Sequence, residues 1–88
     1  MDNLPKYQDL VPALVKVISG AGHPLTNSEI EARMIRELGI PEPLTKIIHS
    51  GKRTELQYRL AWARTKAKSD GLISSPARET WTVAHKGT

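Results

Sequence analysis

Hydrophobic residues recur at helical spacing in three segments of the chain. In residues 4–19 they lie three, one, three, three and one positions apart, at Tyr7, Leu10, Val11, Leu14, Val17 and Ile18. In residues 26–38 they stand at Ile30, Met34, Ile35 and Leu38, and in residues 54–71 at Leu56, Leu60, Ala63 and Ala67. Each set places its apolar side chains on one face of a helix, so the sequence predicts three amphipathic helices.

Two of these helices begin with a capping-box sequence. Thr26 is followed three residues later by Glu29, and Thr54 by Gln57. In such a pair the threonine hydroxyl accepts a first-turn amide, and the Glu or Gln side chain accepts the amide of the threonine. Glycine, which readily takes the left-handed backbone that ends many helices, follows both segments, at Gly39 and Gly71.

The connections between these helices carry weaker signals. Residues 23–25 are expected to be an edge strand at most, because Pro24 cannot donate a ladder hydrogen bond. In the long connection after Gly39, one helical turn is expected to pack into the core through Leu44, Ile47 and Ile48.

After residue 71 the apolar spacing changes from 3.6 to 2. Residues 72–75 and 80–83 are expected to be short strands joined by a loop at residues 76–79, with Trp81 and Val83 facing the core. Three helices followed by a β-hairpin predict a mainly α fold of the winged helix-turn-helix type. In that fold the third helix enters the major groove of DNA and the hairpin is the wing.

The composition narrows the class of protein. The chain has 88 residues and no cysteine, which excludes disulfides and thiolate metal sites. Its three histidines, His23, His49 and His85, show no ligand spacing, so no metal and no cofactor is expected. No stretch approaches the ~20 apolar residues of a membrane span. We expect a cytoplasmic protein with one domain over residues 1–84 and a tail or linker to an absent domain over residues 85–88.

The positive charge is concentrated in the second half of the chain. Residues 1–50 contain five basic and six acidic side chains, whereas residues 51–88 contain eight basic and three acidic ones, which together give the net charge of +4. This asymmetry favours an anionic partner, double-stranded DNA, on the side of the third helix. The alternative interpretation is an ordinary solvated helix face.

The candidate DNA contacts fall into two groups. The basic residues expected to neutralise phosphates are Lys52, Arg53, Lys68 and Arg78. The residues expected to face base edges are Thr54, Gln57, Tyr58, Ala61 and Thr65. Gln57 could bridge adenine N6 and N7, and Ala61 could touch a base methyl group, although Gln57 cannot fully serve both a base and the helix cap.

Trp62 and Arg59 allow two interpretations each. Trp62 lies off the apolar face, where it either packs against the tail or an absent domain, which we favour, or stacks on a methylated base. Arg59 lies near the edge of the buried face, where it either pairs with an acidic residue of the second helix or touches DNA.

Several short motifs, in order, resemble one known family. They are Pro5-Lys6-Tyr7, His49-Ser50-Gly51, the stretch from Arg59 to Thr65 (RLAWART), Gly71-Leu72-Ile73, Ser75-Pro76 and Trp81. Over residues 5–84 the chain is similar to the N-terminal winged-helix domain of Mrr-type restriction endonucleases, which act on modified DNA. The resemblance implies a DNA-reading module joined to a nuclease domain in the same polypeptide. It departs from the family pattern at Tyr58, Lys66-Ala67, Ala77 and Glu79.

The chain itself has no catalytic set. It lacks a Ser/His/Asp set and a carboxylate pair with a lysine in a strand setting, so we expect it to be non-catalytic. A second hypothesis is a protein-interaction or dimerisation module that docks through Trp62 and Tyr58. A third, a small transcription regulator, would need a dimer for which the sequence shows no extra helix. The sequence leaves the oligomeric state open.

Overall fold

The computed structural model describes residues 4–84 of the chain. This part contains four helices, which are α1 (Tyr7–Gly20), α2 (Asn27–Leu38), α3 (Glu42–Thr45) and α4 (Glu55–Ser69). Its strands are β1 (Leu25–Thr26), β2 (Ile48–Ser50), β3 (Arg53–Thr54), β4 (Ile73–Ala77) and β5 (Thr80–Val83). They form a three-stranded antiparallel sheet in the order β1-β5-β4 and a small β2–β3 hairpin. The expectation of a mainly α fold with a small β-hairpin is confirmed at this level. The prediction of a tail or linker at residues 85–88 concerns positions outside the described residues.

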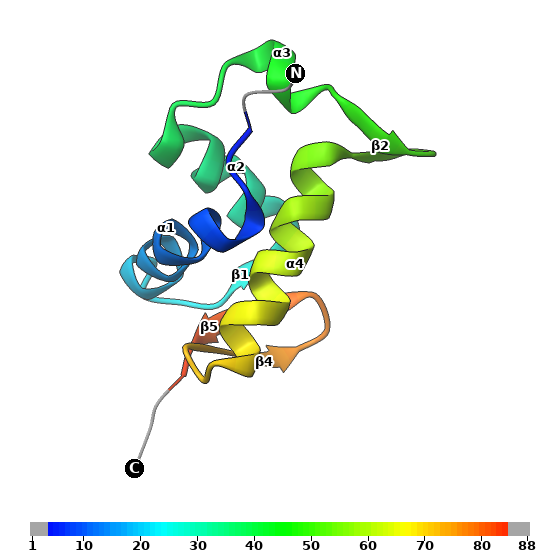
Figure 1. Cartoon of the computed structure of the whole chain (residues 1–88). Helices are drawn as coiled ribbons and strands as arrows, with labels where there is room; N and C mark the ends of the chain where they lie inside the picture. The colour runs from blue at the N-terminus through cyan, green and yellow to red at the C-terminus, as the bar shows by residue number, and fades with distance from the viewer. Residues whose placement is uncertain (1–3, 85–88) are drawn as a thin grey trace.

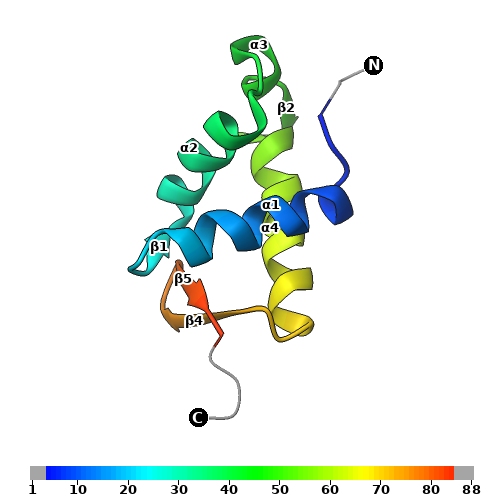
Figure 2. The same ribbon diagram turned by 90° about the vertical axis from the view of Figure 1, so that its left-hand side faces the viewer.

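The core lies where α1 crosses α4 (Figure 2), with α2 packed beside α1. Its buried side chains come from the segment before α1, from all three long helices and from β1 and β4, and they are Leu4, Leu10, Leu14, Ile18, Leu25, Ile30, Met34, Leu56, Leu60, Ala63, Ala67 and Ile73. The apolar faces predicted for the first and third helices are therefore confirmed. Leu38 is an exception, since it lies in the last turn of α2 and remains 37% exposed.

Both predicted capping boxes are formed. The Glu29 amide donates to the Thr26 hydroxyl at 3.2 Å, and the Thr26 amide donates to the Glu29 carboxylate at 2.9 Å. At Thr54 the two equivalent bonds with Gln57 are both 3.1 Å. The positions where α2 and α4 begin were therefore fixed by local sequence, because each box satisfies amides that the first turn leaves without acceptors.

The connection before α4 differs from the expectation. The single helical turn is present as α3, and Leu44 and Ile47 pack against the core. Ile48 does not, since it is the first residue of β2 and is 58% exposed. The β2–β3 hairpin, which pairs Ile48 with Thr54, holds the backbone extended here and turns this side chain outward. Figure 1 shows this hairpin at the N-terminal end of α4.

The C-terminal hairpin is tighter than predicted. Strand β4 runs to Ala77, so its connection to β5 is the pair Arg78-Glu79, with Glu79 at φ 55°, rather than residues 76–79. Pro76 is tolerated because β4 is an edge strand, where its missing N–H breaks no ladder bond. The short strand expected at residues 23–25 lies further along the chain, since β1 is Leu25–Thr26, at the other edge of the sheet, and shares only Leu25 with the predicted segment. Trp81 packs against the core as expected, and its indole N–H donates to Asn27 Oδ1 at 2.7 Å.

Across residues 4–84, none of the helices combines the length and the apolar character that crossing a bilayer requires.

Candidate nucleic-acid interface

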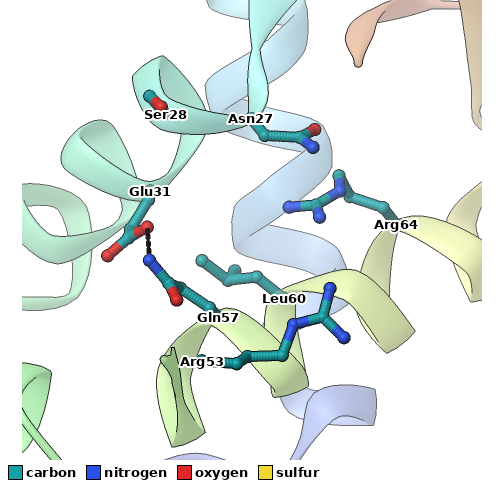
Figure 3. A pocket seen from close by; sticks show the side chains of 7 residues that line it. All are labelled: Asn27, Ser28, Glu31, Arg53, Gln57, Leu60 and Arg64. Carbon is teal, nitrogen blue, oxygen red and sulfur yellow. Dashed lines mark hydrogen bonds between the residues drawn. The ribbon is translucent and has the colours of Figure 1, made fainter. Parts of the chain in front are cut away.

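Two hollows border the exposed side of α4 and meet at Arg53. The first, here called the α2–α4 pocket, has a volume of about 180 Å³ and is lined by Asn27, Ser28, Glu31, Arg53, Gln57, Leu60 and Arg64 (Figure 3). The second, here called the α4 groove, has a volume of about 330 Å³ and is lined by Arg53, Tyr58, Ala61, Trp62 and Thr65. The structure thus brings together most of the residues predicted to contact bases, with one predicted phosphate contact between them.

The remaining predicted phosphate contacts lie around this surface. Lys52 is in the turn between β2 and β3, Lys68 is in the last turn of α4, and Arg78 is at the tip of the β4–β5 hairpin. All three side chains are exposed, and within residues 4–84 none makes a hydrogen bond or ion pair. By contrast, Lys66 of α4 pairs with Asp70 at 3.3 Å. The charges of the three unpaired side chains are available to an anion.

The Gln57 side chain is held at both ends inside the protein. Its Oε1 accepts the Thr54 amide at 3.1 Å, and its Nε2 donates to Glu31 Oε1 of α2 at 3.1 Å. A bidentate contact with adenine would have to replace both bonds. The contact of Gln57 with a base stays a prediction. Forming it would cost the two hydrogen bonds to Thr54 and Glu31.

The other residues predicted to face bases are less constrained. The Thr65 hydroxyl donates to the Ala61 carbonyl at 3.0 Å, which leaves its lone pairs free to accept. Tyr58 stacks on His49 of β2, with ring centroids 3.7 Å apart and an interplanar angle of 13°. The Thr54 hydroxyl accepts the Gln57 amide as part of the cap.

Trp62 lies between two tyrosines and remains 47% exposed. Its ring is 6.2 Å from that of Tyr7 in α1 and 6.4 Å, in an edge-on arrangement, from that of Tyr58. These separations are typical of favourable aromatic pairs. One side of the indole therefore packs within the domain, and the other side faces the α4 groove and the surface.

Arg59 does not pair with the second helix, so that expectation is wrong. Its Nε donates to Glu55 Oε2 of the same helix at 2.7 Å, and its Nη1 donates to the carbonyls of Leu4 at 2.8 Å and Pro5 at 3.2 Å. Arg59 therefore faces the segment that leads into α1. Its role is to fix the start of α1 against α4.

Glu55 joins the β2–β3 hairpin to α4. It accepts from Arg59 Nε and also contacts His49 Nδ1 at 2.9 Å. The hydrogen bond from Arg59, and next the one with His49, lower the pKa of the Glu55 carboxyl from its ordinary value of 4.5. The ionised form is therefore favoured in the folded protein over the unfolded chain.

This shift predicts a pH-dependent stability. Because the folded pKa is depressed, the stabilisation by Glu55 is fully present above about 4.5 and is lost as the pH falls below that value toward the folded pKa. We expect the wild type to be more stable than Glu55→Gln near pH 7 and the difference to narrow below pH ~4.5. Urea unfolding of both proteins from pH 7 to pH 3 measures the difference between their free energies of unfolding. A difference that stays constant with pH would contradict the prediction.

Sequence reasoning missed four residues of the α2–α4 pocket: Asn27, Ser28, Glu31 and Arg64. Arg64 lies inside the stretch from Arg59 to Thr65 that carries the family resemblance but was not among the candidate contacts, and it is only 8% exposed. Its guanidinium lies over the Trp81 ring, 5.8 Å from the centroid, and makes no hydrogen bond within residues 4–84. A usable signal was its spacing, since residue 64 follows Gln57 by two helical turns and therefore shares the face of α4 that meets α2.

Within residues 4–84 no three His, Asp or Glu side chains gather closely enough to hold a metal ion. Comparison with known proteins gives the family. No curated protein and no solved structure matches the sequence. A family model described as the Mrr N-terminal domain matches residues 7–88, nearly the whole chain. The chain therefore belongs to the Mrr N-terminal domain family.

Proposed function

We propose that this domain is a winged helix that binds double-stranded DNA and serves as the recognition module of a Mrr-like restriction system. In this proposal α2 and α4 act as the helix-turn-helix pair, α4 enters the major groove, and the β4–β5 hairpin is the wing. The observation that carries the proposal is the exposed side of α4, where unpaired basic side chains surround a polar pocket and a mainly apolar groove that meet at Arg53. Family membership supports the restriction context.

The contacts divide between the backbone and the bases. Lys52, Arg53, Lys68 and Arg78 neutralise phosphates and set the register of the domain on the duplex. Thr54, Tyr58, Ala61 and Thr65 face base edges, and Gln57 joins them only by giving up its bonds to Thr54 and Glu31. The methyl group of Ala61 suits contact with a thymine or 5-methylcytosine methyl group.

The proposal assigns no catalysis to this chain. Residues 1–84 form the DNA-binding domain, and residues 85–88 lead toward a nuclease domain of the same polypeptide that supplies the cleavage chemistry. In this proposal the domain acts in the cytoplasm.

Duplex binding over a salt series tests the proposal. Fluorescence anisotropy of the domain is measured on one duplex in three forms: unmodified, with 5-methylcytosine and with N6-methyladenine. Steeply salt-dependent binding is expected, because phosphate contacts release counterions, and tighter binding of one modified form would identify the modification. Absence of binding to all three duplexes at low salt would overturn the proposal.

The double variant Lys52→Ala, Arg53→Ala is expected to weaken binding to every duplex. Each phosphate contact contributes about 0.9 to the slope of log K against log salt, so the slope should become shallower by about two. The matched control is Arg33→Ala, Arg36→Ala, whose side chains line a separate hollow between α1 and α2. This control should keep the wild-type slope, and an unchanged slope in the Lys52, Arg53 variant would exclude both residues as phosphate contacts.

A second candidate function, docking of a protein partner or a second copy, is favoured by the exposure of Trp62. The indole stands beside Tyr7 and Tyr58 and is 47% exposed. Large aromatic side chains dominate protein interfaces, and binding through them changes little with salt. A complex that persists at high salt and is lost in Trp62→Ala would support docking over DNA binding.

A further inference from the structure

The α2–α4 pocket contains a buried guanidinium without a hydrogen-bond acceptor. Arg64 is only 8% exposed. Within residues 4–84 none of its five N–H donors has an acceptor. Its contact with Trp81 is through the ring face only. A largely buried charge is costly unless it is paired and hydrogen-bonded, so an anionic acceptor at these donors would be stabilising.

The opening for that acceptor is the pocket itself. No fully enclosed side-chain nitrogen or oxygen in the described residues lacks a partner, so the unbonded nitrogens of Arg64 must retain access to solvent. Figure 3 shows the guanidinium extending from α4 toward the space between α4 and α2, with Arg53 on the other side of Leu60. Two positive side chains therefore border one polar hollow.

The first turn of α2 adds further donors to the same space. The amides of Asn27 and Glu29 donate to the Glu79 carbonyl and the Thr26 hydroxyl, whereas the Ser28 amide has no acceptor within residues 4–84. The side-chain oxygen of Asn27 accepts from Trp81, so its NH2 group is left for the pocket. Unpaired amides at the positive end of a helix dipole favour an anion.

Two acidic side chains, Glu31 and Glu79, lie near Arg64, together with the basic Arg53. Burial and the charge of Arg53 lower the pKa of Arg64, and these effects exceed those of Glu31 and Glu79, which raise it. Glu31 also uses one carboxylate oxygen to accept from Gln57 at 3.1 Å. The repulsion between the two arginines would be relieved by an anion that contacts both of them.

We propose that the α2–α4 pocket binds one phosphate group of the DNA backbone, held by Arg64, Arg53 and the Ser28 amide. The inference rests on the proposed function and deepens it, since it assigns the register-setting contact to a pocket rather than to the exposed lysines. A phosphodiester supplies two acceptor oxygens and one negative charge, which suits a fork of arginine donors beside a free amide. Because the phosphate would be held at the N-terminus of α2 and by two arginines beside α4, this contact would position α4 against the duplex.

The test is Arg64→Met, which keeps an unbranched apolar side chain at this position but removes the guanidinium, its charge and its contact with the Trp81 ring. Binding to every duplex should weaken about ten- to a hundredfold, as expected for loss of charge-assisted hydrogen bonds, and the salt slope should fall by about 0.9. The melting temperature should stay the same or rise, because replacing an uncompensated buried charge with an apolar side chain is not destabilising. A purely structural role for Arg64 predicts a lower melting temperature instead.

Two further variants complete the design. Arg64→Lys keeps the positive charge but loses the paired N–H donors of the guanidinium. It should therefore retain the wild-type salt slope and only part of the duplex affinity. Arg36→Met makes the same chemical change at an exposed position of α2 outside the pocket, and it should bind as the wild type. Wild-type affinity and slope in Arg64→Met would overturn the pocket while leaving the proposed function intact. Weakening on some sequences only, with an unchanged slope, would assign the pocket to a base edge and overturn the phosphate contact.

A second measurement separates failure of the pocket from failure of DNA binding. Inorganic phosphate is added at constant ionic strength against chloride, and the melting temperatures of the wild type and Arg64→Met are compared. A ligand of the folded state raises the melting temperature, so phosphate should stabilise the wild type more than the variant. This result would support the pocket as an anion site even if the domain bound no duplex. An equal response in both proteins would overturn the site.

Discussion

Leu14→Ala is expected to lower the free energy of unfolding by about 2–5 kcal/mol, through lost apolar contact and the cavity left behind. Leu14 is fully buried in α1 and belongs to the core cluster that contains buried residues of α1, α2 and α4. A domain of this size has a total stability of only about 5–15 kcal/mol, and the loss is therefore a large part of it. The melting temperature should fall by about 10 °C or more.

Leu38→Ala is the matched control, because it makes the same chemical change at the end of α2, where the side chain is 37% exposed. It should cost less than about 1 kcal/mol, since less apolar area is removed from contact. Thermal melts monitored by circular dichroism measure both variants. Equal losses in the two would mean that the crossing of α1 and α4 is not the centre of the core.

Local sequence was sufficient to predict the helices. The capping boxes at Thr26 and Thr54 involve residues three positions apart, so their geometry is decided before any tertiary contact forms. The apolar faces of α1 and α4 are likewise set by spacing. Ile48 was misassigned because its apolar character fits both a helical turn and a strand, and only the pairing of β2 with β3 decides between them.

The candidate site was predictable only in part, because two of its features are tertiary. The bond from Gln57 to Glu31 joins residues 26 positions apart, and no local pattern indicates it. Arg64 was not among the candidate contacts, and it is largely buried beside Trp81 of β5, whereas arginine is mostly exposed in folded proteins. The sequence indicated which side of the chain is basic, whereas the division of that side into a pocket and a groove depends on how α2 packs beside α4.

Ala61→Glu is expected to reduce duplex affinity by about a hundredfold or more, since a like charge placed in an interface costs several kcal/mol. Ala61 lies in the α4 groove between the residues proposed to face bases, and a carboxylate there would meet the negative potential of the major groove. Its side chain is only partly buried, so the longer glutamate can extend to the surface. Alanine and glutamate are both good helix formers, and the melting temperature should change little.

The matched control is Ala32→Glu, which adds the same charge at an exposed position of α2 outside both hollows. It should weaken binding only slightly, through the change of one unit in net charge. If Ala61→Glu keeps the duplex affinity and the Lys52, Arg53 variant loses it, α4 does not enter the major groove of DNA. The domain would then bind DNA through the β2–β3 turn and Arg53, and α4 would carry the hollows without reading bases. If Ala61→Glu and Arg64→Met both lose duplex affinity, the α4 groove and the α2–α4 pocket both contact the duplex.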